Sequence, residues 1–469
     1  MGERLHPAAI AVYAVEALRG TALPALVILG VSVLGGGLDS EALLRALGFA
    51  VLGTAGAAIV GAIRWAATRY SVAGGAIRLR HGWLSVKEVE IPFTRVQALD
   101  VEQGPIQRLF GVQAVHVQTG GGGAGGEIVL GALAPSDVER LRQLLAGRRP
   151  QALPEQRAEA PERRLSRRML MVAALTSGQL GVILPLLAGS SQVVDDLFDD
   201  PAQGERAVTG ALPDSAAEWA LAAGGLLTVA WLLAALGTVV AFAGFGVRRE
   251  GDALRVRRGL LQRREVTLRV ARVRAVRVVE GVLRQPFGLA TLRVEVVGYA
   301  KEPPAAQTLF PLLPRKEVRT VLAELLPELA DDPGGLRPPP ARARRRYLLP
   351  PAAVALAAGA VAAIALELPW TLAAGLAGLA YGWLRWRAAG WRLADGRLAV
   401  RGRMLARTTV LAPARNRESH DLAQTPLQRR ARLAHLHVAF GKTTTAGIRH
   451  LDAGVARELW AALSRTEPT

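Results

Sequence analysis

The chain alternates three times between a pair of apolar stretches and a basic, polar segment. An α-helix needs about 20 apolar residues, at a rise of about 1.5 Å each, to cross the hydrocarbon core of a bilayer. Uncharged runs of that length or a little less occur in three pairs: Thr21–Leu38 with Ala46–Ile63, Met169–Ser190 with Trp219–Val247, and Tyr347–Leu366 with Leu368–Leu384. This pattern predicts an integral membrane protein with six transmembrane helices and three copies of one soluble module.

Composition places the boundaries between these parts. The segments Gly147–Leu165 and Pro327–Arg346 are rich in Pro, Arg and Ala, which favours polar linkers. We therefore predict an interfacial helix with the first transmembrane pair at 1–66, module 1 at 67–148, a linker at 149–167, the second pair at 168–246, module 2 at 247–329, a linker at 330–346, the third pair at 347–387 and a divergent module 3 at 388–469. The individual spans are expected near 21–38, 43–65, 168–192, 217–245, 347–366 and 368–386.

The segment Pro7–Gly20 precedes the first span and carries Glu16 and Arg19. It is either an amphipathic helix that lies in the membrane interface or the polar start of a tilted first span. In both cases the spacing of Glu16 and Arg19 favours an ion pair on the helix surface.

The net charge of +19 is unevenly distributed along the chain. The loop 191–219 holds seven acidic residues and one basic residue, whereas the segment 246–301 holds fourteen Lys and Arg against five Asp and Glu. Because positive residues stay in the cytoplasm, we expect the modules and both termini to face the cytoplasm at the plasma membrane. Basic segments directly after membrane spans favour anionic lipid over nucleic acid as the partner.

The modules repeat at fixed offsets. A shift of 177 positions places Gly82 on Gly259, and it places Phe110 and Gly111 on Phe287 and Gly288. A shift of 321 positions places Pro105, Gln107 and Arg108 on Pro426, Gln428 and Arg429. A constant shift over tens of residues indicates duplication of one module.

Each module has the pattern of several strands followed by one helix. Residues 77–80 and 254–257 alternate between apolar and basic side chains, which is typical of half-buried strands. Apolar residues three to four positions apart then indicate a C-terminal helix in each module: Val138, Leu141, Leu144 and Leu145, with Ser136 as the expected N-cap; Val318, Val321, Leu322 and Leu325; and Val455, Leu459 and Leu463. The pattern predicts small antiparallel sheets closed by a helix.

The stretch from Arg95 to Gly111 resembles the signature of the bacterial pleckstrin-homology-like (PH-like) membrane proteins of the YdbS/YdbT type, in the larger form with three modules. Module 2 keeps a weaker version from Arg272 to Gly288, and module 3 has Ala431 and Arg432 where the signature has Phe and Gly. The resemblance implies three PH-like barrels, each made of antiparallel sheets with a C-terminal capping helix, and no catalytic activity. It also implies a role in cell-envelope homeostasis or antimicrobial tolerance.

Two sets of residues are candidates for function. The first is the signature turn, whose role we expect to be mainly structural, with Phe110 filling the core: Gln103, Gly104, Pro105, Gln107, Arg108, Phe110, Gly111, Gly281, Phe287 and Gly288. The second is an arginine set in module 2, which is either an ordinary solvated face or a surface for anionic lipid or a protein partner: Arg255, Arg257, Arg263, Arg264, Arg272 and Arg274.

Other motifs do not support a cofactor or metal. Gly121, Gly123 and Gly126 match a dinucleotide-binding pattern, but the residues after them predict a strand and not the required helix. Gly441-Lys442-Thr443 lacks the first glycine of a phosphate-binding loop. His435 and His437 have no evident third ligand, and the chain has no cysteine.

We therefore expect a non-enzymatic membrane scaffold or binding protein without cofactors, whose partners are anionic lipid headgroups, a membrane protein or a second copy of the chain. The alternative is a transporter or export accessory subunit that uses the six-helix bundle. Transport requires polar residues in the bundle interior, and the predicted spans are mostly Ala, Leu, Val and Gly. Small residues such as Ala373–Ala380 instead favour close helix packing.

Overall fold

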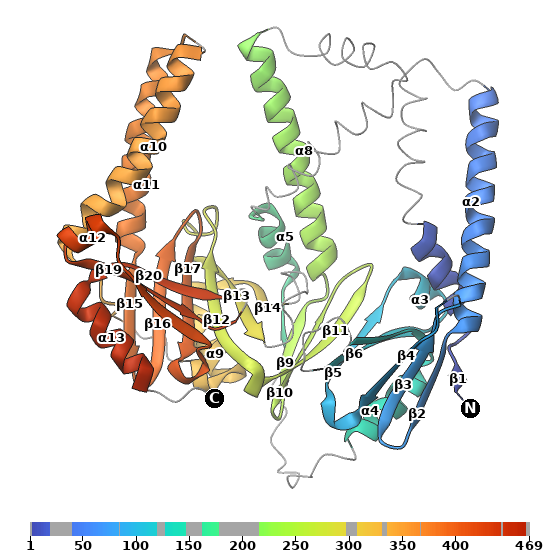
Figure 1. The fold of residues 1–469 in the computed structure, drawn as a ribbon. Helices are drawn as coiled ribbons and strands as arrows, with labels where there is room; N and C mark the ends of the chain where they lie inside the picture. Colours follow the sequence, from blue (N-terminus) through green and yellow to red (C-terminus); the bar gives the residue numbers. More distant parts are fainter. Residues whose placement is uncertain are drawn as a thin grey trace. The chain divides into compact units, whose positions relative to one another are not determined.

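The computed structural model describes residues 2–18, 40–83, 85–119, 127–146, 162–177, 215–296, 307–330, 335–365, 367–441 and 444–465. The chain divides into two compact units. Unit 1 comprises Met1–Ala158, Leu170–Phe245 and Val256–Thr267, and unit 2 comprises Glu159–Met169, Gly246–Arg255 and Leu268–Thr469. The division passes through module 2, which therefore contributes strands to both units (Figure 1).

Each module consists of six described strands and a C-terminal helix, as the alternation and the helical spacing predict. Module 1 has β2 (Arg69–Ala73), β3 (Ala76–His81), β4 (Lys87–Pro92), β5 (Val96–Gln103), β6 (Gln113–Thr119), β7 (Glu127–Leu133) and α4 (Pro135–Ala146). Module 2 has β9 (Gly246–Glu250), β10 (Ala253–Arg258), β11 (Arg263–Arg269), β12 (Val273–Glu280), β13 (Leu289–Val296), β14 (Thr308–Pro314) and α9 (Val318–Leu325). Module 3 has β15 (Gly390–Ala394), β16 (Arg397–Arg403), β17 (Arg407–Pro413), β18 (Ser419–Ala423), β19 (Leu433–Ala439), β20 (Thr445–Asp452) and α13 (Ala453–Arg465).

Short elements complete the described chain. Two-residue strands β1 (Glu3–Arg4) and β8 (Arg163–Arg164) pair with β2 and β9, respectively. Short helices follow the signature strands of modules 1 and 3, namely α3 (Pro105–Leu109) and α12 (Pro426–Arg430). Single 3-10 turns lie between β4 and β5, β11 and β12, and β17 and β18.

Strand pairing crosses the predicted module boundaries, and it does so twice in the same register. In unit 1, β5 of module 1 pairs antiparallel with β11 of module 2, with Gln103 opposite Arg263. In unit 2, β12 of module 2 pairs antiparallel with β17 of module 3, with Glu280 opposite Arg407. The repeat offsets carry the first pair of residues onto the second. The latter halves of modules 1 and 2 are therefore covered at one edge by the next module, which protects a strand edge that would otherwise be open. The predicted domain boundaries themselves stay predictions.

The helices close the cores as expected, with two corrections. All four predicted apolar residues of α9 are buried, as are Leu459 and Leu463 of α13. In α4, Val138 and Leu141 are buried but Leu144 is exposed. Ser136 is not the N-cap, because α4 already begins at Pro135 and the amide of Val138 donates to the carbonyl of Ala134.

The N-terminal segment forms the helix Ala9–Leu18, which packs on module 1. Its residues Ala9 and Tyr13 belong to the same core cluster as the strands of that module. Glu16 pairs with Arg64 at 3.0 Å, and the predicted pair with Arg19 stays a prediction because Arg19 lies outside the described residues. One face of the helix therefore packs on module 1. Neither the interfacial helix nor the tilted start of a span, the two interpretations of Pro7–Gly20, included this contact.

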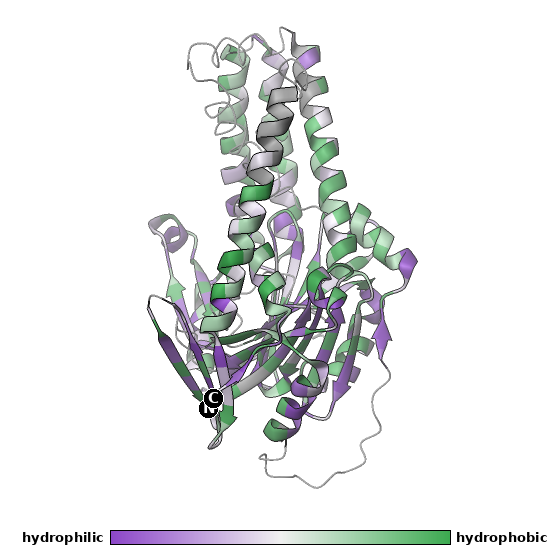
Figure 2. Cartoon of the chain, turned by 90° about the vertical axis from the view of Figure 1, so that its right-hand side faces the viewer, coloured by the Kyte–Doolittle hydropathy of each residue, from purple (hydrophilic) through white to green (hydrophobic). Residues whose placement is uncertain are grey.

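Two helices in the described part of the chain are long and apolar enough to cross a membrane, against six predicted. They are Gly224–Phe242, within α8 (Ala216–Phe242), and Ala341–Ala365, which includes α10 (Arg344–Ala365). The predicted span 21–38 and most of 168–192 lie outside the described residues; the described part of 168–192 includes α5 (Arg167–Leu175). The span 43–65 falls in α2 (Ser40–Ala67), whose apolar part Val51–Ala67 is shorter, and 368–386 falls on a 3-10 turn and α11 (Ala374–Ala388). The long helices are predominantly hydrophobic, whereas the strands mix hydrophobic and hydrophilic residues (Figure 2).

Helices α10 and α11 form the tight hairpin that their small residues predict (Figure 1). A Cβ atom added at Gly378 would lie 2.6 Å from the carbonyl oxygen of Pro351, and one at Gly382 would lie 2.5 Å from that of Tyr347. Such backbone proximity requires glycine at the contact.

Glu280 provides a direct test of the pairing between modules. Its side chain is 1% exposed and accepts two hydrogen bonds from the guanidinium of Arg407 on the paired strand. We expect Glu280→Ala to lower the free energy of unfolding by about 2–3 kcal/mol, because it leaves Arg407 partly buried without its acid. The matched control is Gln103→Ala at the equivalent position of module 1, where a single amide bond to the carbonyl of Val112 is lost at a cost of about 1 kcal/mol. Denaturation of the solubilised full-length variants measures both, and equal losses would contradict the prediction.

The residue that ends the signature turn provides a second test. Gly111 and Gly288 have φ values of 65° and 60°, and Arg432, which replaces the glycine in module 3, has a φ of 52°. A side chain in this left-handed region costs about 1 kcal/mol or more. We expect Arg432→Gly to raise stability by about 0.5–1 kcal/mol and Gly288→Ala to lower it by a similar amount. Thermal unfolding checks the opposite signs, and a destabilised Arg432→Gly protein would refute this interpretation.

Candidate functional site

The residues of the signature turn make local contacts in the structure, and their mainly structural role stays a prediction. Gln103 donates from its side chain to the carbonyl of Val112 at 3.1 Å, and Gln424 at the equivalent position of module 3 donates to Leu433 at 2.7 Å. A Cβ at Gly104 would lie 2.6 Å from Oε1 of Gln107, a contact that a shift of this flexible side chain relieves, and module 3 has Thr425 at the equivalent position. Pro105 begins α3, and Gly281 accepts from the amide of Arg284 at 2.9 Å in module 2.

Phe110 does not fill the core. Its side chain is 48% exposed, and Phe287 at the equivalent position of module 2 is 72% exposed. Leu109, Val282, Leu283 and Leu427 of the same turns are exposed as well. The turn therefore presents apolar side chains to the surface of each module.

A second apolar loop occurs at the turn between the second and third strands of each module. The repeat shifts place Trp83 on Leu260 and Met404, and these side chains are 69%, 50% and 72% exposed. Leu261 and Leu405, the next residues in modules 2 and 3, are also exposed. We call these three loops the hairpin tips: Trp83 in module 1, Leu260 and Leu261 in module 2, and Met404 and Leu405 in module 3. None of these residues is among the predicted site residues, although the shifts of 177 and 321 positions align the three loops.

The hairpin tip of module 2 contacts the end of α8, and the tips of modules 1 and 3 line cavities together with residues at the ends of α2 and α11. The amides of Gly259 and Leu260 donate to the carbonyls of Ala243 and Val240 at the end of α8, both at 2.9 Å. Trp83 lines a cavity together with Arg64 and Ala67 at the end of α2. Met404 and Leu405 line a cavity with Arg385 in the last turn of α11. Arg108 of the signature turn donates to the carbonyl of Leu260 at 3.1 Å, so the two apolar loops meet in unit 1.

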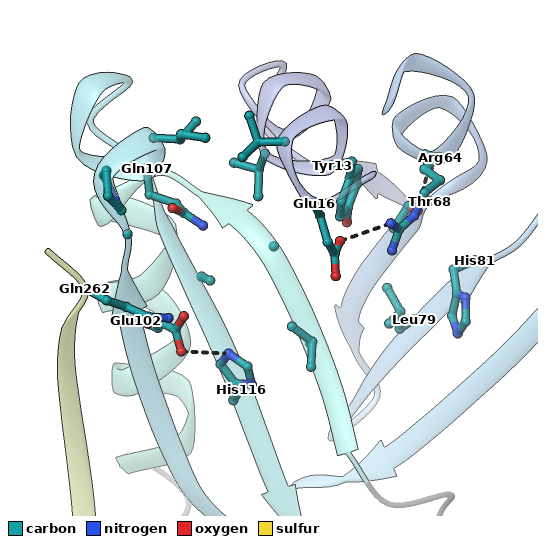
Figure 3. Close-up of a pocket in the computed structure, with 18 of the residues that line it drawn as sticks. Tyr13, Glu16, Arg64, Thr68, Leu79, His81, Glu102, Gln107, His116 and Gln262 are labelled. Carbon is teal, nitrogen blue, oxygen red and sulfur yellow. Dashed lines mark hydrogen bonds and ion pairs between the residues drawn. The ribbon is translucent and has the colours of Figure 1, made fainter. Parts of the chain in front are cut away.

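A large cavity of about 1030 Å³ lies in unit 1 (Figure 3). It is bounded by the N-terminal helix, the signature turn and the hairpin tip of module 2. Glu16 and Arg64 form an ion pair on one side, and Glu102 lies 3.6 Å from His116 on the other (Figure 3). Glu102 also pairs with Arg264 at 2.8 Å. Burial raises the pKa of the nearby Tyr13 phenol, which stays neutral under the guanidinium of Arg64. We call this space the first cavity.

The arginine set of module 2 is not one uniform exposed face. Arg257 and Arg263 are exposed, whereas Arg255, Arg264, Arg272 and Arg274 are half-buried. Three of them have acidic partners: Arg255 with Glu250 at 3.3 Å, Arg257 with Glu265 at 3.4 Å and Arg264 with Glu102 at 2.8 Å. Nearby carboxylates therefore neutralise the charge of three of these six arginines, as is common on ion-paired protein surfaces. A role of this set in binding lipid or a partner stays a prediction.

The glycine-rich motifs lie mostly outside the described residues, so the prediction that they bind no cofactor stays a prediction. Residues 120–126 and 442–443, which carry the glycine run and part of the second loop, lie outside the described residues. Among the described residues, no group of three His, Cys, Asp or Glu side chains has the arrangement of a metal site. His435 lies against His450 with 4.6 Å between ring centroids, and burial lowers the pKa of both rings to about 4. These imidazoles are therefore neutral at pH 7.

Comparisons with known proteins agree with the repeat. The family model described as the bacterial PH domain matches residues 21–149, 206–329 and 347–467. The chain is 25% identical over 464 residues to the UPF0699 transmembrane protein YdbT of Bacillus subtilis (strain 168), covering 92% of this chain and 91% of the relative. No solved structure matches. Because the family model covers three stretches that together make up most of the sequence, the chain belongs to the bacterial PH domain family.

Proposed function

We propose that this chain is a non-enzymatic scaffold of the plasma membrane whose PH-like modules contact an anionic bilayer surface from the cytoplasmic side. The similarity to a transmembrane protein over nearly the full length supports the membrane location. The two candidate spans among the described residues support it further. The six-span arrangement predicted from the sequence is part of this proposal.

The hairpin tips are the observation that carries the proposal. Removing apolar side-chain surface from water is favourable by about 25 cal/mol per Å², so large apolar side chains that stay half or more exposed forgo this stabilisation. Here they occur at the same turn of all three modules and beside the ends of apolar helices. A bilayer interface in contact with the hairpin tips would cover these side chains, since amphipathic segments bury their apolar residues at the boundary between headgroups and acyl chains.

Pairs of arginine and aromatic rings mark the same helix ends. Arg64 at the end of α2 lies over Tyr13 at 4.5 Å, and Arg258 lies over Phe242 of α8 at 5.9 Å. At the end of α11, Arg387 lies over Trp383 at 5.1 Å. Aromatic residues with cationic partners are typical of the interface between the hydrocarbon and the headgroups. These positions therefore favour a headgroup layer at the level of the hairpin tips.

The described spans do not favour transport. The hydroxyls of Thr228 and Thr238 in α8 donate to the carbonyls of Gly224 and Ala234 within their own helix. Their polar atoms are thus used locally, and the segment Gly224–Phe242 contains no charged residue. A membrane protein or a second copy of the chain as partner, and a role in the cell envelope, stay expectations from the sequence.

A single-cysteine probe tests the contact with the bilayer, because the chain has no cysteine of its own. We expect an environment-sensitive fluorophore on Trp83→Cys, in full-length protein in vesicles with phosphatidylglycerol, to shift to the blue and to be quenched by lipid-borne nitroxides. The matched control is Ala73→Cys, an exposed residue at the opposite end of the β2–β3–β4 meander. We expect several-fold weaker quenching there.

Changing the lipid composition of the vesicle separates electrostatic attraction from hydrophobic burial. Replacing phosphatidylglycerol with phosphatidylcholine removes the attraction of arginine for the surface but not the hydrophobic contribution, so quenching at position 83 should fall and become insensitive to salt. Equal quenching at positions 73 and 83 in anionic vesicles would refute the proposal.

A further inference from the structure

Unit 2 contains a second cavity, of about 590 Å³, at the position that corresponds to the first cavity in the repeat. Glu102, His116, Leu261 and Gln262 line the first cavity, and the repeat offsets carry them onto Val279, Arg293, Leu405 and Ala406, which line the second. Tyr347 in the first turn of α10 and Arg385 in the last turn of α11 complete its wall. The second cavity therefore lies at the base of the helix hairpin that contains the candidate span Ala341–Ala365.

The lining of the second cavity is strongly cationic. Six arginines contribute to it, and none of the described lining residues is Asp or Glu: Arg277, Arg293, Arg385, Arg401, Arg403 and Arg449. Two of them contact neutral side chains, since Arg401 donates to the hydroxyl of Thr409 at 3.2 Å and Arg403 donates to the amide oxygen of Gln285. Among the described residues, the buried Nε atoms of Arg293 and Arg385 have no hydrogen-bond partner.

One cross-strand pair of arginines in this lining is particular to module 2. Arg277 on β12 is directly opposite Arg293 on β13. The equivalent pair is Asp100 opposite His116 in module 1, and Asp421 opposite His437 in module 3. Like charges directly opposite each other destabilise a sheet. Burial, and then the charge of Arg277, lowers the pKa of Arg293, as expected for crowded cations.

We propose that the second cavity binds a phosphate-bearing anion, namely the headgroup phosphate of an anionic membrane lipid at the base of the α10–α11 hairpin. Guanidinium groups match phosphate oxygens in geometry and charge, and a bound anion relieves the repulsion between Arg277 and Arg293. The cavity is larger than one phosphate group, and its apolar lining by Met404 and Leu405 suits the glycerol and upper acyl part of a lipid. This inference rests on the membrane attachment proposed above and names the ligand class of one site.

The repeat supplies a variant that is expected to fold. Arg277→Asp with Arg293→His installs the pair that modules 1 and 3 already have at this position. In full-length protein in a neutral detergent, binding of dihexanoyl phosphatidylglycerol is measured by calorimetry and by the rise in melting temperature. We expect saturable binding to the native protein and at least a tenfold loss of affinity in this variant. Its melting temperature without anion should equal or exceed that of the native protein.

A charge-matched control excludes a general electrostatic effect. Arg277→Gln with Arg293→Gln removes two positive charges from the cavity, and Lys316→Gln with Arg319→Gln removes two from exposed positions of the same unit outside the cavity. Only the first pair should weaken binding. An equal loss in both pairs, or no loss in either, would overturn the proposal.

Two further ligands identify the source of the phosphate. Dihexanoyl phosphatidylcholine, which has no net charge, and inorganic phosphate should each bind at least tenfold more weakly than dihexanoyl phosphatidylglycerol. Tighter binding of inorganic phosphate would overturn the assignment to a lipid headgroup. If the probe at position 83 is quenched but the protein in detergent does not bind phosphatidylglycerol, this inference is overturned and the proposed membrane contact is not. If phosphatidylglycerol binds but the probe is not quenched, the proposed membrane contact is overturned and this inference is not.

Discussion

The backbone pairing between consecutive modules is the constraint on which the rest of the structure depends. β5 pairs with β11 in unit 1, and β12 pairs with β17 in unit 2, in registers that the repeat makes equivalent. Each pairing satisfies the hydrogen bonds of a strand edge that a lone module would leave open to aggregation. It also places the hairpin tip of one module next to the signature strand of the module before it. Both cavities form at this junction, because the two elements that line each of them come from successive modules.

Duplication allows the same position to carry different chemistry on an unchanged backbone. The first cavity has acidic as well as basic side chains, namely Glu102 beside His116 and Glu16 paired with Arg64. In the second cavity Val279 takes the place of Glu102 and Arg293 that of His116, and five further arginines line it. The ladder of main-chain hydrogen bonds fixes the register in both cases, and it makes no demand on the charge of the side chains that point into the cavity. The side chains that line the two cavities can therefore differ between modules, as long as repulsion between like charges does not destabilise the sheet.

The elements of each module follow from local patterns in the sequence, whereas the contacts between modules do not. Period-two alternation gave the strands, and helical spacing gave α4, α9 and α13, because burial of one face acts over a few neighbouring residues. The pairing of Glu280 with Arg407 joins residues 127 positions apart, and nothing in either strand selects that partner over another basic strand. The exposure of Phe110 was misjudged for a similar reason. An aromatic residue between turn glycines suits a core as well as a surface, and only the packing decides between them.

The variation among the hairpin tips bears on what covers them. At the first position of the tip the three modules have Trp, Leu and Met, which share apolar character but differ in shape and volume, and the next residue in the sequence is Leu in each. A protein pocket selects for shape, since interface cores pack as densely as protein interiors. A bilayer interface selects only for hydrophobicity and for a cationic surround, which Arg64, Arg258 and Arg387 supply beside the helix ends. Three unlike side chains at equivalent turns therefore fit a lipid surface better than three copies of one protein-binding site.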